Sequence, residues 1–328
     1  MKRILSLTAI LLVLLAAAVA YSVHRPYQGF SQDQFVEFPK GTGTMEMARR
    51  LAKAGIIPTR WHLLAARALR PGQRWQAGEY RFSKPASPWE IAGRLQRGDV
   101  YLVELRIPEG YNLFDIGSVV EQAGLGTSAD FVSAARRPGM IRDLAPQAPS
   151  LEGFLFPSTY HVPRKINAET LCRLFTDQFR KEWKAAGGGN DNVLATVTLA
   201  SLVEKETGVS EERTLVAGVY KQRLDKGMRL EADPTTIYAA MLEGIWRGTI
   251  YKSDLQRLHP YNTYAVAGLP PGPIANPGRA SLAAALRPKE TEFLYFVAKG
   301  DGSGGHNFSK TYAEHSRAVQ AWRRGRAD

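Results

Sequence analysis

Two glutamates near the end of an apolar segment are the residues of this chain best suited to chemistry. Glu204 and Glu206 belong to the stretch Ser-Leu-Val-Glu-Lys-Glu-Thr at residues 201–207. A carboxylate set among apolar side chains must find partners or shift its pKa toward the neutral form, because burial penalises its charge. A carboxylic acid that is still neutral near pH 7 can donate a proton. The stretch therefore indicates acid/base chemistry.

The choice between the two glutamates depends on their place in a helix predicted over residues 192–207. At about 100° per residue they fall on nearly opposite sides, so helical geometry alone does not choose. Glu206 lies in the last turn before Thr207-Gly208, where a helix ends and a side chain can open into a cleft. The helix dipole would also raise its pKa, which favours Glu206 as the acid. The alternative is that the glutamates cap or bridge neighbouring elements through Arg213 or Arg223.

The N-terminus predicts a location outside the cytoplasm. After Lys2 and Arg3, residues 4–23 contain no charge, and about 20 apolar residues match the hydrocarbon thickness of a bilayer. The basic residues before this segment predict a single-pass anchor over residues 1–23, with the bulk of the chain outside. Residues 24–34 would then be a linker. A signal peptide cleaved after Ala18-Val19-Ala20 is the alternative, and it leads to the same compartment.

Composition narrows the class of protein further. With 44% hydrophobic and 23% charged residues, the 328-residue chain can bury a core and is long enough for about two domains. Cys172 is the single cysteine, which excludes an intrachain disulfide and a multi-cysteine zinc site. The histidines are scattered, and motifs for zinc proteases, nucleotide binding and serine hydrolases are absent, so we predict no metal and no cofactor. The net charge of +12 favours lipid head groups and acidic wall polymers over nucleic acid as anionic partners.

A short internal sequence repeat predicts small α+β units in the first half of the chain. Phe-Pro-Lys-Gly at 38–41 recurs as Ile-Pro-Glu-Gly at 107–110, and each copy leads into a helix that starts near Thr44 or Leu113 and ends at Ala-Gly. A third, looser copy covers residues 80–95. Two or three copies are too few for a solenoid, so we expect a compact module of strands and helices over residues 35–107.

Beyond residue 150 the sequence predicts helices separated by loops rich in proline and glycine. The loop 269–278 contains four prolines, which exclude a helix or a central strand. This loop is either a surface connector or the rigid wall of a cleft. The run Tyr-Asn-Thr-Tyr at 261–264 favours the wall, because aromatic and amide side chains suit the faces and hydroxyls of sugars. The helices are expected at residues 168–186, 192–207, 211–226, 235–242 and 279–286.

Six motifs in this order resemble the YceG/MltG family, whose members are endolytic murein transglycosylases. The resemblance covers nearly the whole chain. The sequence departs from the family at Glu231, where glutamine is common, and at Ser158, where aspartate is common. The motifs are Leu-Glu-Gly-Phe-Leu-Phe-Pro at 151–157, the 201–207 stretch, Met-Arg-Leu at 228–230 with Asp-Pro-Thr at 233–235, Tyr-Asn-Thr-Tyr at 261–264, Leu-Pro-Pro-Gly at 269–272, and the segment from Tyr295 to Gly-His-Asn-Phe at 305–308.

The resemblance implies an α+β architecture: an N-terminal transmembrane helix, a LysM-like module at 35–107, and a mixed helical catalytic domain at 108–328 with cleft loops rich in proline and glycine. It implies a lyase in which Glu206 protonates the oxygen linking MurNAc to GlcNAc. The same carboxylate then takes the proton of the MurNAc 6-hydroxyl, which closes a 1,6-anhydro ring. Residues expected to bind or orient substrate are Glu204, Glu152, Asp233, Tyr261, Asn262, Thr263, Leu269, Pro270, Asn276 and His306.

The expected partners are peptidoglycan glycan strands, the membrane and, through the family, the peptidoglycan synthase complex. The protein would sit in the bacterial inner membrane with its catalytic domain on the extracytoplasmic side, where it would terminate the elongation of nascent strands. A hypothesis from another class is a noncatalytic, membrane-anchored peptidoglycan-binding protein in which the glutamates are structural.

Overall fold

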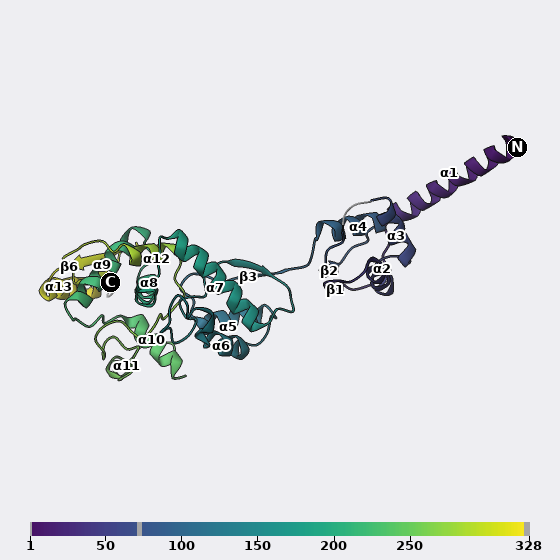
Figure 1. Cartoon of the computed structure of the whole chain (residues 1–328). Helices are drawn as coiled ribbons and strands as arrows, with labels where there is room; N and C mark the ends of the chain where they lie inside the picture. The colour runs from purple at the N-terminus through teal and green to yellow at the C-terminus, as the bar shows by residue number, and fades with distance from the viewer. Residues whose placement is uncertain (1, 71–73, 325–328) are drawn as a thin grey trace. The chain divides into compact units, whose positions relative to one another are not determined.

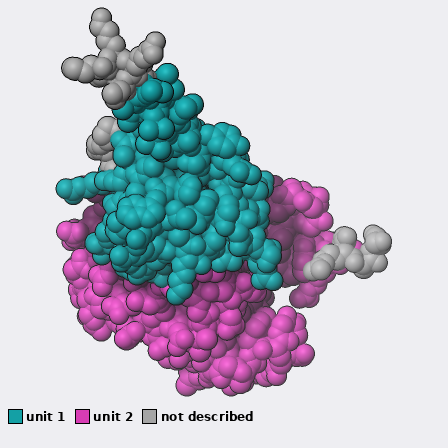
Figure 2. Space-filling view, turned by 90° about the vertical axis from the view of Figure 1, so that its right-hand side faces the viewer, with its two compact units in different colours: residues 1–103 teal, residues 104–328 magenta. Residues whose placement is uncertain are grey.

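The computed structural model describes residues 2–70 and 74–324, and it divides into two compact units. Unit 1 comprises residues 1–103 and unit 2 residues 104–328, coloured separately in Figure 2. Helices and short strands occur in both units, which confirms the predicted α+β class.

Unit 1 packs helices against a two-stranded sheet (Figure 1). Strands β1 and β2 are antiparallel, with Val36 opposite Tyr80. Alternate strand residues, including Phe38 and Phe82, are buried, because successive side chains of a strand point to opposite faces. The apolar sides of the helices complete the core. The elements are α1 (Lys2–His24), β1 (Gln34–Phe38), α2 (Thr44–Lys53), α3 (Arg60–Ala68), β2 (Gly78–Phe82) and α4 (Pro88–Arg97).

Helix α1 is the membrane-length segment. Within the described residues it is the one helix long and apolar enough to cross a membrane, judged by length and composition, with a mean hydropathy of 2.2 over Leu7–His24. Its last turn belongs to the core of unit 1, because Val23 is fully buried and the His24 ring stacks on Trp89 at 4.9 Å. The membrane-length helix therefore continues directly into the folded unit.

The segment expected as a linker, residues 24–34, is held against unit 1. Tyr27 forms a β-bridge with Ala86, and the Gly29 amide donates to the carbonyl of Gly55 at 2.8 Å. The backbones approach so closely there that a Cβ on Gly55 would lie 2.6 Å from the Gly29 carbonyl oxygen. This segment is therefore packed against unit 1 and does not form an extended linker.

The two copies of the sequence repeat have similar local structure, although they belong to different units. Helix α2 starts at Thr44 and α5 (Leu113–Gln122) starts at Leu113, and each ends before its Ala-Gly pair. Gly55 and Gly124 follow with φ of +69° and +68°, a conformation that glycine adopts without a steric penalty. The first copy belongs to unit 1 and the helix of the second to unit 2.

Unit 2 is mainly helical, with two strand pairs, β3–β4 and β5–β6. The five helices predicted beyond residue 150 are confirmed, and their ends differ from the prediction by at most two residues. The sequence analysis missed the short α11 and the C-terminal α13. The elements are β3 (Val103–Arg106), α5, α6 (Ser128–Ala135), β4 (Thr159–Val162), α7 (Ala168–Ala185), α8 (Val193–Glu206), α9 (Arg213–Asp225), α10 (Asp233–Leu242), α11 (Lys252–Gln256), α12 (Arg279–Leu286), β5 (Tyr295–Ala298), β6 (His306–Ser309) and α13 (Tyr312–Arg324).

Helix α8 lies inside unit 2 and contacts α9, α10 and α12. Residues on all its sides are buried, including Val197, Ala200 and Leu202, so it has no polar face of the kind a surface helix shows. A helix enclosed in this way holds its C-terminal residue, Glu206, in a fixed position.

The proline-rich loop 269–278 has neither helix nor strand, as predicted. Its second half, residues 272–278, is buried, so this part is not a surface connector. The cause is packing against neighbouring loops. A Cβ on Gly153, which has a φ of +85°, would lie 2.4 Å from a ring carbon of Pro273.

Candidate active site

Glu206 ends α8; the residue as a whole is partly exposed, while its carboxyl group is surrounded by protein. Burial raises its pKa to about 7, a hydrogen bond from Tyr220 opposes this shift, and the charge of Asp233 adds to it. The next residue, Thr207, is extended and ends the helix. Glu206 is therefore an acid that is substantially protonated at neutral pH, on a residue that is not fully buried.

Tyr220 on α9 is the hydrogen-bond partner of Glu206. The residue is 1% exposed, and its ring packs edge-on against Phe296 at 5.8 Å. Burial raises the pKa of the phenol well above 10, so it remains a donor across the physiological range. The sequence analysis did not select Tyr220. One signal in the sequence could have found it. Tyr220 lies on the apolar side of the next predicted helix, and a buried phenol needs a hydrogen-bond partner.

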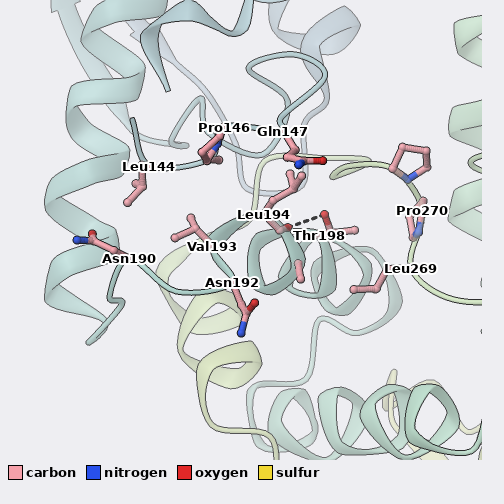
Figure 3. A pocket seen from close by; sticks show the side chains of 13 residues that line it. Leu144, Pro146, Gln147, Asn190, Asn192, Val193, Leu194, Thr198, Leu269 and Pro270 are labelled. Carbon is pink, nitrogen blue, oxygen red and sulfur yellow. Dashed lines mark hydrogen bonds between the residues drawn. The ribbon is translucent and has the colours of Figure 1, made fainter. Parts of the chain in front are cut away.

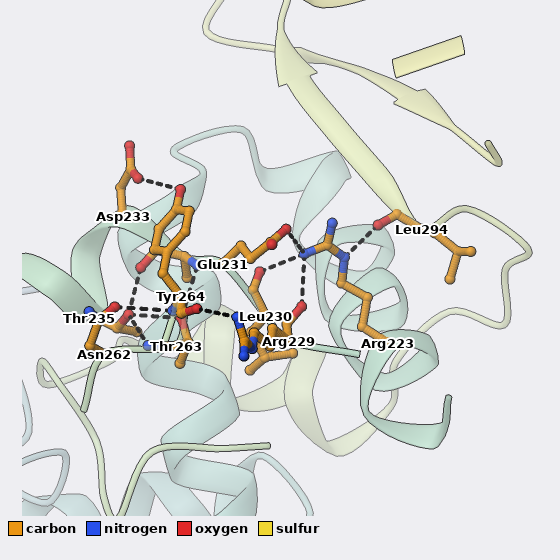
Figure 4. A network of polar contacts seen from close by, with 11 residues as sticks. Arg223, Arg229, Leu230, Glu231, Asp233, Thr235, Asn262, Thr263, Tyr264 and Leu294 are labelled. Carbon is orange, nitrogen blue, oxygen red and sulfur yellow. Dashed lines mark hydrogen bonds and ion pairs between the residues drawn. The ribbon is translucent and has the colours of Figure 1, made fainter. Parts of the chain in front are cut away.

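Asp233 is the first residue of α10, and it lies at the exposed side of this cluster. The hydroxyl of Tyr264 donates to its Oδ1 at 2.6 Å, as Figure 4 shows. Burial and then Asp233 raise the pKa of Tyr264, and the charge of Glu206 contributes to the same shift. Glu206, Asp233 and Tyr264 are thus one electrostatically coupled group.

A buried arginine holds the chain that leads into Asp233 (Figure 4). Arg223 is 7% exposed, and its Nε donates to the carbonyl of Leu294 at 2.7 Å. Its Nη1 donates to the carbonyls of Leu230 at 2.8 Å and Arg229 at 3.1 Å. Nη1 also lies 3.4 Å from the carboxylate of Glu231, the position that departs from the family pattern. Glu231 has a φ of +53°, so these contacts hold a backbone conformation that is unfavourable for a side chain with a Cβ.

The predicted binding residues Asn262 and Thr263 are each 1% exposed and bind other parts of the protein. Thr263 Oγ1 accepts from the amide of Ala232 at 3.0 Å and lies 2.9 Å from Thr235 Oγ1. Asn262 Nδ2 donates to the carbonyl of Arg257 at 2.7 Å. These two side chains fix the loop that carries Tyr264 against the start of α10. Their neighbour Tyr261 is 9% exposed and packs on Tyr238 at 5.2 Å.

Glu204 faces a different part of unit 2 from Glu206. Its Oε2 accepts from the amide of Gly278 at 3.0 Å, at the N-terminus of α12. A carboxylate there satisfies a free backbone donor and interacts favourably with the helix dipole. Burial and then the charge of Glu204 raise the pKa of nearby Glu109. Glu204 therefore caps a neighbouring helix through a backbone amide, whereas the alternative from the sequence named Arg213 or Arg223 as the partner.

Glu152 and Asn276 form a buried junction between three segments. Glu152 is 1% exposed, and its carboxylate accepts from the Leu113 amide at 2.9 Å, the Tyr238 hydroxyl at 2.9 Å and Asn276 Nδ2 at 2.7 Å. Burial outweighs these hydrogen bonds and raises the pKa of Glu152 to about 8. Asn276 is 0% exposed and also accepts from the Leu155 amide at 2.9 Å. Neither side chain is open to a ligand from solvent.

Leu269 and Pro270 line a pocket of about 350 Å³ at the N-terminal end of α8 (Figure 3). Amide side chains, among them Gln147 and Asn192, share its wall with apolar ones such as Leu144. The α8 residues that line this pocket run from Val193 to Thr198, which places them about 12–20 Å from Glu206 along the helix. The pocket and the acid are separate features of one helix.

His306 is paired with Glu212, at 2.7 Å from Nδ1 to Oε2. The His306 amide donates to the other oxygen of the same carboxylate at 2.9 Å. These bonds join β6 to the turn before α9. Within residues 2–70 and 74–324, no group of three or more histidine, cysteine, aspartate or glutamate residues could hold a metal ion.

A buried, substantially neutral carboxyl, oriented by a phenol at a helix end, defines a protein equipped for general acid/base chemistry. The chain belongs to the YceG-like family, whose family model matches residues 36–321. An endolytic murein transglycosylase of Bacillus subtilis (strain 168) is 29% identical over 307 residues, which cover 88% of this chain and 84% of that protein.

A second relative has the same name and comes from Streptococcus pneumoniae serotype 2. It is 29% identical over 295 residues, or 80% of this chain, and the match spans about half (54%) of the relative's length. A solved structure, a protein from Listeria monocytogenes described as yceG-like, is similar with a TM-score of 0.56 and 29% identity. The similarity covers 88% of this chain and 99% of that one. Sequence and fold therefore agree on the family.

Proposed function

We propose that this protein is an endolytic peptidoglycan lytic transglycosylase that cuts the MurNAc–GlcNAc bond within glycan strands and leaves a 1,6-anhydroMurNAc end. The observation that carries the proposal is the state of Glu206. Burial raises its pKa to about 7, and it lies at a helix end with partial access to solvent. Family membership and the names of the relatives supply the substrate class.

The reaction uses Glu206 first as an acid and then as a base. Protonated Glu206 gives its proton to the glycosidic oxygen, and the bond between that oxygen and the anomeric carbon of MurNAc breaks. The resulting carboxylate accepts the proton of the MurNAc 6-hydroxyl, whose oxygen forms the new bond to the anomeric carbon. Glu206 is protonated again at the end, and neither water nor a protein nucleophile is consumed.

Tyr220 and Asp233 give Glu206 its two required properties. The Tyr220 phenol donates to the carboxyl, so it fixes which oxygen is free to face substrate. Burial is the main cause of the raised pKa of Glu206, and the negative charge of Asp233 adds to it, so both preserve the acid form. Asp233 and Tyr264 also offer exposed polar atoms to sugar hydroxyls beside the acid.

The other predicted site residues are assigned to two roles. Leu269 and His306 are partly exposed and, together with the largely buried Tyr261 and Pro270, are assigned to contacts along the glycan strand. The polar side chains that bond within the protein act by positioning: Asn262 and Thr263 hold the loop at Tyr264, and Glu152 with Asn276 joins the loops around α8. Glu204 is assigned to capping α12.

Unit 1 is assigned to a small glycan-binding module similar to LysM. The support is its compact core and the order of its elements, in which two helices lie between two antiparallel strands in the chain. Helix α1 is assigned to a single-pass anchor in the bacterial inner membrane, with unit 2 on the extracytoplasmic side. Cutting at that site would terminate nascent strands, with the peptidoglycan synthase complex as the partner that supplies them.

The test compares two isosteric variants of the same helix. Full-length protein, Glu206→Gln and Glu204→Gln are incubated with purified murein, and the products are identified by mass spectrometry. We expect 1,6-anhydro products from the wild type and Glu204→Gln, because a glutamine at 204 still accepts from Gly278, and none from Glu206→Gln. Equal yields from all three proteins would remove Glu206 from its role. Hydrated reducing ends would identify a hydrolase instead.

A further inference from the structure

Helix α3 has an apolar side that is exposed. Its buried residues, Leu63 and Ala66, face the core of unit 1. Trp61 and Leu69, which follows the helix, are 59% and 54% exposed, and Ala68, also exposed, lies about 20° from Trp61 in helical phase. At about 100° per residue these three residues lie on one side, opposite the buried pair. An exposed tryptophan beside an exposed leucine indicates a surface that contacts another apolar environment.

Arginines flank this apolar side. The segment 60–70 contains Arg60, Arg67 and Arg70 and no acidic residue. The Arg60 guanidinium lies over the Trp61 ring at 4.8 Å, and Arg70 lies over Trp89 of α4 at 3.7 Å. A helix with tryptophan and leucine on one side and arginine at its margins is typical of segments that lie in the plane of a membrane interface.

The position of α3 in unit 1 matches this composition. The C-terminal end of α1 packs against α3 and α4, as Figure 1 shows, and Val23 at that end is part of the same core. A helix beside the point where a membrane span enters the fold lies at the bilayer surface when the span is inserted. The linkage to α1 also removes most of the entropic cost of bringing α3 to lipid.

We propose that the exposed side of α3, defined by Trp61, Ala68 and Leu69, inserts into the membrane interface, with Arg60 and Arg67 on anionic lipid head groups. The proposal rests on the membrane anchorage proposed above for α1. The depth expected for such a helix is about 5–10 Å into the boundary between head groups and acyl chains. A sugar-binding face is disfavoured, because segment 60–70 has no carboxylate or amide side chain to hydrogen-bond hydroxyls.

The experiment places a fluorescent probe on this side of α3 in the full chain. Ala68→Cys is labelled with an environment-sensitive dye, and Lys40→Cys in the exposed turn after β1 is the control. The natural Cys172 is fully buried, and burial raises its thiol pKa to about 12, so it does not compete for the label. Each protein is reconstituted into lipid nanodiscs of phosphatidylcholine, with or without phosphatidylglycerol, in which acyl chains carry bromine as a quencher.

We expect strong quenching at position 68, weak quenching at position 40, and an increase at position 68 when phosphatidylglycerol is present. The double variant Arg60→Gln/Arg67→Gln should lose that increase. Lys40→Gln, which neutralises one charge outside α3, should retain it. Equal quenching at the two positions overturns the proposal. So does a response at position 68 to soluble murein fragments without quenching by lipid, which assigns the face to glycan.

Two further readouts on the same preparation separate this proposal from those it rests on. Retention of the chain in the nanodisc reports the anchor, and formation of anhydro products reports the catalytic function. A chain that is retained and active while position 68 stays unquenched disproves the interfacial face alone. A chain that leaves the nanodisc disproves the anchor and the face together.

Discussion

The Tyr264 hydroxyl donates a 2.6 Å hydrogen bond to Oδ1 of Asp233, and this bond holds a negative charge beside the proposed acid, Glu206. Burial raises the pKa of Glu206 most, the charge of Asp233 adds to this rise, and the hydrogen bond from Tyr220 lowers the pKa. Protein groups therefore act on the proposed acid in opposite directions. The balance between them sets the pH range over which the enzyme works.

Asp233→Asn removes the charge but keeps an oxygen that accepts from Tyr264. We expect the pKa of Glu206 to fall from about 7, so that the acid form is lost at lower pH. Above the new pKa, the rate falls about tenfold per pH unit. The measurement is kcat/KM for anhydro product as a function of pH, with Asp225→Asn, an exposed carboxylate on α9, as the control. A profile that moves to higher pH would contradict the assignment.

Tyr220→Phe is expected to shift the profile the other way. Without the phenol the pKa of Glu206 rises, so activity persists to higher pH while its maximum falls because the carboxyl is less well oriented. The control is Tyr160→Phe, which removes another buried hydroxyl, bonded to the carbonyl of Phe156 at 2.6 Å. Both variants should lose about 1 kcal/mol of stability. Only Tyr220→Phe should move the pH profile, and a matching shift in the control would falsify the role of Tyr220.

Stability of unit 2 should fall as pH rises. Glu152 and Glu206 have folded-state pKa values of about 8 and about 7, both above the ordinary 4.5. Their contribution to stability is present below about pH 4.5, and it is lost as pH rises through the folded values, at about 1.4 kcal/mol per pKa unit. Urea unfolding followed through Trp183, which is buried in unit 2, measures the slope. Glu152→Gln should flatten it, and a slope that Glu152→Gln leaves unchanged would rule out Glu152 as its source.

Arg223→Lys tests whether the buried guanidinium positions the segment before Asp233. Lysine cannot reach three carbonyls with a planar fork, so we expect a loss of about 2–4 kcal/mol and a lower kcat. KM should change less, because the effect is on the geometry around Glu206. Arg142→Lys, an exposed change in the same unit, is the control. If kcat is unchanged in the Arg223 variant, its role is confined to stability.

The sequence was sufficient to locate the helices of the site. Apolar length and a Thr-Gly stop predicted α8 and placed Glu206 in its last turn, and helical phase separated Glu204 from Glu206. The same reasoning found the bounds of α2 and α5, because the Pro-x-Gly turn before each helix and the Ala-Gly pair after it are local signals. Local signals carry over to the structure because they depend on a few neighbouring residues.

Contacts between segments that are distant in the chain could not be predicted from the sequence. Tyr220 meets Glu206 only because α9 folds back along α8, and Glu152 meets Asn276 across 124 positions. The sugar-binding character read from residues 261–264 did not reveal that Asn262 and Thr263 are turned inward. The residue type in the sequence does not show whether a polar side chain binds a ligand or a backbone carbonyl. Exposure decides between these roles, and exposure is a property of the tertiary fold.

Helix α1, proposed above as the membrane anchor, continues without a break into the core of unit 1. Val23 is buried in that core and the His24 ring stacks on Trp89, so the end of α1 is held against the unit. Each residue inserted within α1 would therefore turn unit 1 by about 100° and displace it by about 1.5 Å along the helix axis. With α1 in the bilayer, as proposed, rotation of this helix about its axis would also rotate unit 1.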